Sequence, residues 1–302
     1  MSRINATAYS HVVIEVSDLD RAVAFYRDIL GAGDSVPWPE PECAALALGG
    51  GQCLVLAAAA RPRSFADTGA HVAYRVAPSI LVLIEERAAK AGLEIARYLE
   101  DRPEEAAQNR YLSDPDGNRI QIVSGSDAET MPVIDHAAVI VSDIEWADDF
   151  WVEGSGQKVV HRVGWATGDF LRARDWGDGK EDMAPGTRRW DQRYRDIPGG
   201  KPGQGRKVAR PCPQLFIDLG GSAVLGIFLA SNHFQEPLLE TTRGYPRIGL
   251  RVDDSGLDSL ARDLAAAGAR IEGPVDGEGG PFRRSVFMRD RCGIFTEFSS
   301  IA

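Results

Sequence analysis

The chain is poor in cysteine and contains no long apolar run. Its four cysteines show no CxxC spacing, which indicates reduced thiols rather than a disulfide framework or a zinc site; they are Cys43, Cys53, Cys212 and Cys292. No apolar stretch approaches the roughly 18 residues that a membrane span needs. The opening residues, MSRINATAYSH, lack the basic-then-apolar pattern of a signal peptide. We therefore expect a cytoplasmic protein with no membrane partner.

Positive charge is also scarce. The chain carries 34 lysines and arginines against 44 aspartates and glutamates, a formal net charge of −10. A nucleic-acid partner needs a basic face that neutralises phosphates, so we expect none. The sequence has no P-loop, no GxGxxG opening a helix and no GxSxG elbow. Self-association into a homo-oligomer stays open.

The chain does contain an internal repeat. HVVIEVSDLDRAVAFYRDILG, which begins at His11, aligns without a gap with HAAVIVSDIEWADDFWVEGSG, which begins at His136. Each copy starts as an apolar strand, and a helix follows with apolar residues at i, i+3 and i+4. In the first copy we expect Ser17 as the N-cap of this helix and Asp18 in its first turn. Gly31 is expected at its C-terminal end.

A second repeat links two other stretches. HVAYRV, from His71, matches RIGLRV, from Arg247. YLSDPDGNRIQIV, from Tyr111, matches FMRDRCGIFTEFS, so that Gln121 falls on Glu297. A helical pattern that ends in glycine lies between HVAYRV and YLSDPDGNRIQIV, and another lies between RIGLRV and FMRDRCGIFTEFS. The chain therefore contains four similar units, each predicted to run strand–helix–strand–strand–strand, which is an α+β fold.

A polar linker, SGSDAETMP, separates the units into two pairs. We place an N-terminal domain at residues 1–126 and a C-terminal domain at residues 132–302. The second contains an insertion at about residues 165–211 with no counterpart in the first. Its aromatic residues, including Trp165 and Trp176, indicate packing rather than a disordered linker. A substrate-binding loop and a dimer contact are both consistent with this composition.

The strand histidines, VSDLDRAVAFYRDILG, HVAYRV and DPDGNRIQI together resemble the vicinal-oxygen-chelate superfamily. This group includes glyoxalase I, fosfomycin and bleomycin resistance proteins, and type I extradiol dioxygenases. The resemblance covers nearly the whole chain except the insertion, and two domains in about 300 residues is the extradiol arrangement. It implies two cup-shaped mixed sheets built from paired units. It also implies a divalent metal, Fe(II) or Mn(II) or else Zn or Ni, bound by the first strand of one unit and the first and last strands of its partner.

Carried over residue by residue, the resemblance implies two ligand sets. Some members pair the first unit with the second, and others pair it with the fourth. The sets are therefore either His11/His71/Gln121 and His136/Arg247/Glu297, or His11/Arg247/Glu297 and His136/His71/Gln121. Under either pairing, one cup reads His, His, Gln and the other His, Arg, Glu.

Each set departs from the pattern at one position. Arginine stays protonated and cannot bind a metal, so Arg247 would pair with Glu297 or bind an anionic substrate, unless His233 replaced it as a ligand. Glutamine can bind a metal, but losing the carboxylate charge lowers affinity. The extradiol signature of tyrosine, Asp-Pro-x-Gly and glutamate keeps Tyr111 but has Gln121 for the glutamate. Tyr111 and Arg247 are thus the candidate catalytic residues.

Hypotheses from different functional classes follow. The first is a metal-dependent enzyme that acts on a small oxygenated, aromatic substrate by extradiol-dioxygenase-like or glyoxalase-like chemistry, the latter a lyase or isomerase reaction. The alternative is a metal-free binding or sequestering protein with no cofactor, whose cups are pockets and whose Arg247 recognises a carboxylate or phenolate. A catalytically inactive scaffold subunit is the third. Neither the substrate nor the pairing of units follows from the residues alone.

Overall fold

The structure is a computed structural model that describes residues 4–62, 70–95, 108–125, 130–141, 144–163, 214–221, 223–229, 241–277 and 280–301. The insertion expected at about residues 165–211 lies outside this part of the chain, and with it Trp165 and Trp176. His233 lies outside it as well. No helix among the described residues is long and apolar enough to cross a membrane.

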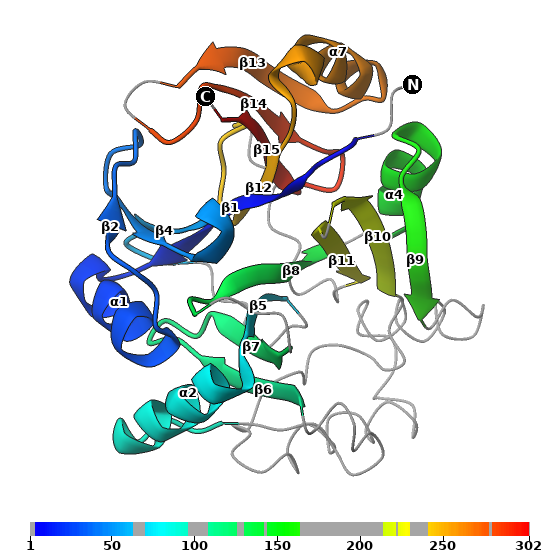
Figure 1. The fold of residues 1–302 in the computed structure, drawn as a ribbon. Helices are drawn as coiled ribbons and strands as arrows, with labels where there is room; N and C mark the ends of the chain where they lie inside the picture. Colours follow the sequence, from blue (N-terminus) through cyan, green and yellow to red (C-terminus); the bar gives the residue numbers. More distant parts are fainter. Residues whose placement is uncertain are drawn as a thin grey trace.

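Two mixed β-sheets make up the described fold (Figure 1). Sheet A has eight strands in the order β13-β14-β15-β12-β1-β4-β3-β2, and sheet B has seven in the order β6-β7-β5-β8-β11-β10-β9. The strands of sheet A are β1 (Ala8–Val16), β2 (Ser35–Val36), β3 (Cys43–Ala47), β4 (Cys53–Ala58), β12 (Arg247–Arg251), β13 (Arg270–Asp276), β14 (Arg284–Arg289) and β15 (Phe295–Ser300). Those of sheet B are β5 (His71–Val76), β6 (Asn109–Ser113), β7 (Arg119–Ser124), β8 (Val133–Val141), β9 (Lys158–Val163), β10 (Gln214–Gly220) and β11 (Ala223–Leu229).

A helix follows the first strand of every unit. These helices are α1 (Leu19–Phe25) after β1, α2 (Pro78–Lys90) after β5, α4 (Ile144–Asp148) after β8 and α7 (Leu257–Ala266) after β12. Helices α1 and α4 each continue as a π-helical turn, over Tyr26–Leu30 and Asp149–Gly154. The predicted α+β fold of four repeated units in two mixed sheets is confirmed. In the second unit, residues 96–107 lie outside the described residues.

The pairing of strands joins the first unit to the fourth and the second to the third. β1 pairs with β12, and β8 pairs with β5, both antiparallel. Each sequence half, residues 1–126 and 132–302, therefore contributes one unit to each sheet. Of the two pairings left open by the sequence, this one groups His11 with Arg247 and Glu297, and His136 with His71 and Gln121.

An aspartate caps the start of helix α1, and a glycine ends the π-helical turn that follows it. Its N-cap is Asp18, whose side chain accepts a hydrogen bond from the Arg21 backbone N–H at 3.0 Å. The expectation that Ser17 would cap this helix was wrong, because the Ser17 hydroxyl instead donates to Asp116 at 2.5 Å. The π-helical turn that continues α1 ends at Gly31, whose φ of 85° is the left-handed conformation expected of a C-terminal glycine.

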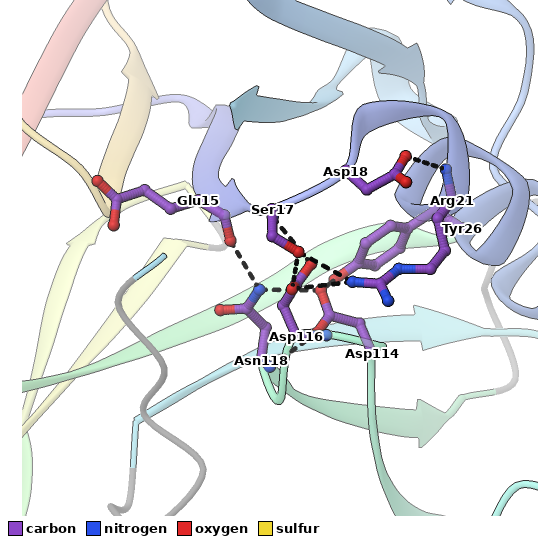
Figure 2. A network of polar contacts seen from close by, with 8 residues as sticks. All are labelled: Glu15, Ser17, Asp18, Arg21, Tyr26, Asp114, Asp116 and Asn118. Atoms are coloured by element: carbon purple, nitrogen blue, oxygen red, sulfur yellow. Dashed lines mark hydrogen bonds and ion pairs between the residues drawn. The ribbon is translucent and has the colours of Figure 1, made fainter. Parts of the chain in front are cut away.

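The turn between β6 and β7 connects sheet B to the start of α1 on sheet A (Figure 2). The Asp114 carboxylate accepts hydrogen bonds from the backbone N–H groups of Asp116, at 2.9 Å, and Asn118, at 2.8 Å. Its other oxygen accepts from the Tyr26 hydroxyl at 3.1 Å. Asn118 also donates to the Glu15 carbonyl at 3.0 Å. The turn thus holds a unit of one sheet against a unit of the other.

The same connection recurs in the second half of the chain. The Asp290 carboxylate accepts from the backbone of Cys292 and Ile294, at 2.9 and 2.8 Å, and from the Trp151 indole N–H at 2.8 Å. Asp290 is the repeat partner of Asp114, and Trp151 is that of Tyr26. Each half of the chain therefore ties its own two units together although they belong to different sheets.

Both sheets share one hydrophobic core, and alternation along the strands decides which residues face it. Val12 and Ile14 of β1 pack in this core with Ile134 of β8. Side chains alternate between the faces of a strand, so His11 and Val13 lie on the opposite face of β1. That opposite face is where the candidate site residues of each sheet gather.

Candidate functional site

The candidate residues occupy equivalent positions in the two sheets. In sheet A, His11 pairs in register with Gly249 of β12, and Gly249 pairs with Glu297 of β15. Arg247 lies two residues before Gly249 and thus on the same face. We call the side chains around His11, Arg247 and Glu297 cup A. Gly249 is required here because a Cβ at this position would overlap the His11 ring.

Sheet B repeats this arrangement with other residues. His136 of β8 pairs in register with Ala73 of β5, and Ala73 pairs with Gln121 of β7. His71 lies two residues before Ala73 on the same face. We call the side chains around His71, His136 and Gln121 cup B.

A chain of opposite charges fills cup A. One oxygen of the Glu297 carboxylate lies 3.2 Å from His11 Nε2 and 3.2 Å from Arg247 Nε. Neither contact is aligned as a hydrogen bond, whereas the other oxygen accepts one from the Ser285 hydroxyl at 2.8 Å. The far end of the Arg247 guanidinium donates to Glu40 at 2.6 Å. Arg247 therefore lies between two carboxylates.

Aromatic rings cover these charges. The rings of Trp38 and Phe282 lie 5.0 and 5.2 Å from that of His11, measured between centroids. The rings of Tyr245 and Phe287 lie 5.3 and 5.1 Å from the guanidinium of Arg247. The relative exposure that remains is 0% for His11, 1% for Arg247 and 3% for Glu297. Cup A is closed to solvent.

Burial and charge act in opposite directions on Glu297. Burial alone would raise the pKa of its carboxyl, but the nearby His11, and after it Arg247 and Ser285, lower that pKa to about 2. The two carboxylates beside Arg247 raise the pKa of its guanidinium despite its burial. A permanent cation thus already neutralises the carboxylate that a metal would need. The residues of cup A do not fit a divalent metal.

The two histidines of cup B point their Nε2 atoms at each other. His71 Nε2 lies 3.1 Å from His136 Nε2, and both residues are only partly buried. Two imidazole nitrogens bound at about 2.1 Å to one metal, roughly at right angles, lie about 3 Å apart. The separation therefore suits two ligands of one ion. In the protein alone it is the distance of a hydrogen bond between the rings.

Gln121 and Tyr111 lie beside this pair. Gln121 donates from its Nε2 to the Asn109 side chain at 3.0 Å, which leaves its carbonyl oxygen as the atom that can meet a cation. Tyr111 pairs in register with Gln121 across β6 and β7. Its ring centroid lies 6.3 Å from that of His71. Two nitrogens and one oxygen are a donor set that fits a divalent metal, although none of the three donors carries a charge.

Asp135 is a site residue that the sequence reasoning missed. Its carboxylate lies 2.8 Å from His136 Nδ1 and 3.5 Å from Arg75. Burial would raise the pKa of Asp135, but the hydrogen bond and charge of His136, with Arg75, lower it overall. The signal was present as a carboxylate next to a candidate ligand, in DHAAVIV where the first repeat has SHVVIEV.

Phenylalanines of β10 and β11 line the other side of cup B. The Phe228 ring lies 6.1 Å from that of His71, and the Phe216 ring lies 5.6 Å from Phe228. They therefore lie on the side of the histidine pair opposite to Tyr111. Among the described residues no group of three or more histidines, cysteines, aspartates or glutamates is placed to hold a metal.

Part of the chain matches the model of a known protein family. Residues 8–122 match the family model described as Glyoxalase/Bleomycin resistance protein/Dioxygenase superfamily. None of the curated proteins matches the sequence. The superfamily resemblance read from the repeats is confirmed for this range.

Solved structures share the fold over almost the full chain. A Bacillus subtilis protein provisionally described as a dioxygenase matches with a TM-score of 0.61 and 13% identity, over 98% of this chain and 86% of its own. Glyoxalase I from Zea mays matches with a TM-score of 0.55 and 15% identity, over 97% and 92%. A variant of the maize enzyme matches with a TM-score of 0.58 and 16% identity, over 97% and 93%. At such identities the likeness establishes the fold alone.

Proposed function

We propose that this chain, whose residues 8–122 match the Glyoxalase/Bleomycin resistance protein/Dioxygenase superfamily model, is a metal-dependent enzyme whose site is cup B. His71, His136 and Gln121 are assigned as the metal-holding residues. His11 and Glu297 belong instead to the closed ion-pair network of cup A. The observation that carries this proposal is the 3.1 Å approach of two imidazole Nε2 atoms in a partly exposed cup.

The chemistry of the donors favours cup B over cup A. Neutral imidazole nitrogen is a common ligand for iron, manganese, nickel and zinc, and an amide oxygen is a weaker one. Cup A offers one histidine and one carboxylate, but the guanidinium of Arg247 lies against that carboxylate and repels a cation. We expect Fe(II) or Mn(II) in cup B, with Zn or Ni as the other candidates.

The charge of cup B also indicates the class of substrate. Its three proposed ligands are neutral, so a bound divalent ion would keep its full charge. An anionic substrate with two adjacent oxygens would compensate that charge, whereas a neutral substrate would not. The rings of Phe228 and Phe216 give an apolar surface on one side of the histidine pair, and the ring of Tyr111 lies on the other side. We therefore propose a small, aromatic, oxygenated anion.

Each residue of cup B has a separate task in this proposal. The metal, when bound, would supply Lewis-acid polarisation of the substrate oxygens. Tyr111 provides a hydroxyl that can donate to or accept from a substrate oxygen. Phe228 and Phe216 exclude water from one side and orient the ring of the substrate. Both an extradiol-dioxygenase-like and a glyoxalase-like reaction are compatible with these parts.

Metal analysis of variants tests the assignment. Purified protein is loaded anaerobically with Fe(II), or in air with Mn(II), desalted and measured for bound metal. The expected result is about one equivalent per chain for the wild type and less than about a tenth for His71→Ala and His136→Ala. Wild-type protein that stays below a tenth of an equivalent would contradict the proposal.

The second cup supplies a matched control. His11→Ala removes the equivalent histidine from cup A, and we expect it to keep the full metal content provided that its circular dichroism shows a folded protein. If His11→Ala lost the metal and His71→Ala kept it, the site would have to be moved to cup A.

The metal-free alternative depends on Arg247 meeting an anionic ligand. In the structure Arg247 is 1% exposed and its guanidinium contacts Glu297 and Glu40. We therefore propose a structural role for Arg247, as the internal cation of cup A, in place of substrate binding or catalysis.

A further inference from the structure

A β-bulge brings Asp135 to the same side of β8 as His136. β5 pairs with β8 through Ala73 and His136 and then through Tyr74 and Ile134, so Asp135 is the extra residue with no opposite partner in β5. Without the bulge, neighbouring residues would point to opposite faces. With it, the Asp135 carboxylate reaches His136 Nδ1 at 2.8 Å.

Sheet A contains the same bulge with a different side chain. β1 pairs with β12 through Tyr9 and then through His11, so Ser10 is the extra residue. The Ser10 hydroxyl lies 3.0 Å from His11 Nδ1. The fold therefore places a side chain against Nδ1 of the first-strand histidine in both sheets. Only cup B, the cup with the open histidine pair, has a carboxylate there.

The difference between the two side chains matters for the imidazole. A carboxylate only accepts hydrogen bonds, so in the neutral imidazole Nδ1 carries the proton and Nε2 presents its lone pair. A serine hydroxyl donates or accepts equally well, so Ser10 does not by itself fix the tautomer of His11. Arg75, 3.5 Å from the other oxygen of Asp135, holds the carboxylate from its far side.

We propose that Asp135 is a positioning residue of cup B: it fixes His136 as the Nδ1–H tautomer and aims the Nε2 lone pair at His71 and the centre of the cup. This inference rests on the proposed function for the metal that the lone pair would serve. The tautomer itself is a property of the chain, and it can be measured with no metal present.

One consequence concerns His71. If His136 Nε2 is a bare acceptor, the 3.1 Å contact requires His71 to donate its Nε2 proton in the metal-free protein. A metal bound by both rings needs lone pairs on both Nε2 atoms. Metal binding should therefore move the proton of His71 to its Nδ1, while His136 keeps its tautomer.

The test combines the ring tautomers with metal affinity. The chain has five histidines, so each imidazole can be assigned in ¹⁵N NMR spectra by substitution. Asp135→Ser copies the arrangement around His11 into cup B, Asp135→Asn keeps an acceptor without the charge, and Ser10→Ala is the matched change in cup A. Metal affinity is measured by titration with Co(II) alone, followed by its absorption spectrum.

We expect His136 of the metal-free wild type to carry its proton on Nδ1. In Asp135→Ser we expect a mixture of the two tautomers of His136. We expect Asp135→Ser to weaken Co(II) binding about 10- to 100-fold, Asp135→Asn to lose less because its amide oxygen still accepts, and Ser10→Ala to lose nothing. An unchanged tautomer and affinity in folded Asp135→Ser would overturn the proposal.

The two proposals fail in different ways. Wild-type protein that binds no Co(II), yet shows the His136 tautomer shift in Asp135→Ser, would overturn the metal assignment and leave the positioning role intact. Wild-type protein that binds Co(II) with His136 protonated on Nε2 in the metal-free state would overturn the positioning role alone.

Discussion

The hydroxyl of Tyr26 donates a hydrogen bond to the carboxylate of Asp114 at 3.1 Å, across the boundary between the two sheets. Tyr26 ends helix α1 beside sheet A, and Asp114 begins the β6–β7 turn of sheet B (Figure 2). Both side chains are buried. The contact is therefore part of what holds the two cups in a fixed relation.

Removing this hydroxyl should weaken the protein. In Tyr26→Phe the buried Asp114 carboxylate loses one donor while its backbone donors remain, and the free energy of unfolding should fall by about 1–3 kcal/mol. Denaturant unfolding followed by circular dichroism measures the change. Val23→Ala, a change on the same helix at a partly buried position, controls for loss of packing in α1. A Tyr26→Phe variant as stable as the wild type would show that the contact between the sheets is not stabilising.

The ion pair between Glu297 and Arg247 in cup A should make the stability of the protein depend on pH. The pKa of Glu297 is about 2 in the folded protein, below its ordinary value of 4.5. The unfolded chain therefore binds more protons between these values. The stabilisation from Glu297, on the order of 3 kcal/mol, is present above about pH 4.5 and lost as the pH falls through about 2.

Glu297→Gln isolates this contribution. The variant should be less stable than the wild type by about 3–5 kcal/mol at pH 7, because Arg247 stays buried with one carboxylate fewer. Its difference from the wild type should shrink towards pH 2. The double variant Glu297→Gln, Arg247→Met should recover much of the loss. A difference between wild type and Glu297→Gln that does not vary with pH would contradict the assigned charge state.

Asp290 should produce the opposite pH dependence. Burial raises its pKa to about 6, although Ile294, Trp151 and Cys292 donate hydrogen bonds that lower it. A folded pKa above the ordinary value of 3.8 means that the folded state binds the proton more tightly. Its stabilisation is full below about pH 4 and is lost as the pH rises through about 6.

As the pH rises from about 4 to about 6, the free energy of unfolding of Asp290→Asn should therefore increase relative to that of the wild type, by up to about 3 kcal/mol. A constant offset is expected as well, because the amide cannot accept from every donor that the carboxylate accepts from. Chemical unfolding at several pH values measures the gain. The exposed residue Asp276, changed in the same way, is the control for removing one carboxylate charge from the chain.

Restoring a carboxylate to cup B should strengthen metal binding. In Gln121→Glu the third donor acquires a negative charge beside the two histidines, so affinity for Mn(II) should rise on the order of tenfold or more. Asn109 can turn its amide to donate to the new carboxylate. Titration with Mn(II), followed by electron paramagnetic resonance, measures the change. Equal affinity in both proteins would mean that residue 121 does not bind the metal.

Much of the fold was readable from the repeats. Apolar periodicity and the glycines after the helices are local signals, and a strand or helix satisfies them whichever unit it later pairs with. The cap of α1 was misread for a tertiary reason. Asp116, distant in sequence, takes the Ser17 hydroxyl, so Asp18 caps the helix.

Only part of the candidate site could be predicted from the sequence. The sequence determined that one cup would have His, His, Gln and the other His, Arg, Glu, because the repeats align these residues under any pairing. Which residues come together depended on pairing between strands far apart in the chain, such as β1 with β12. Only the tertiary structure decided that Arg247 meets Glu40 and closes cup A, and that a bulge turns Asp135 towards His136. Both contacts depend on backbone geometry and partners that no local pattern encodes.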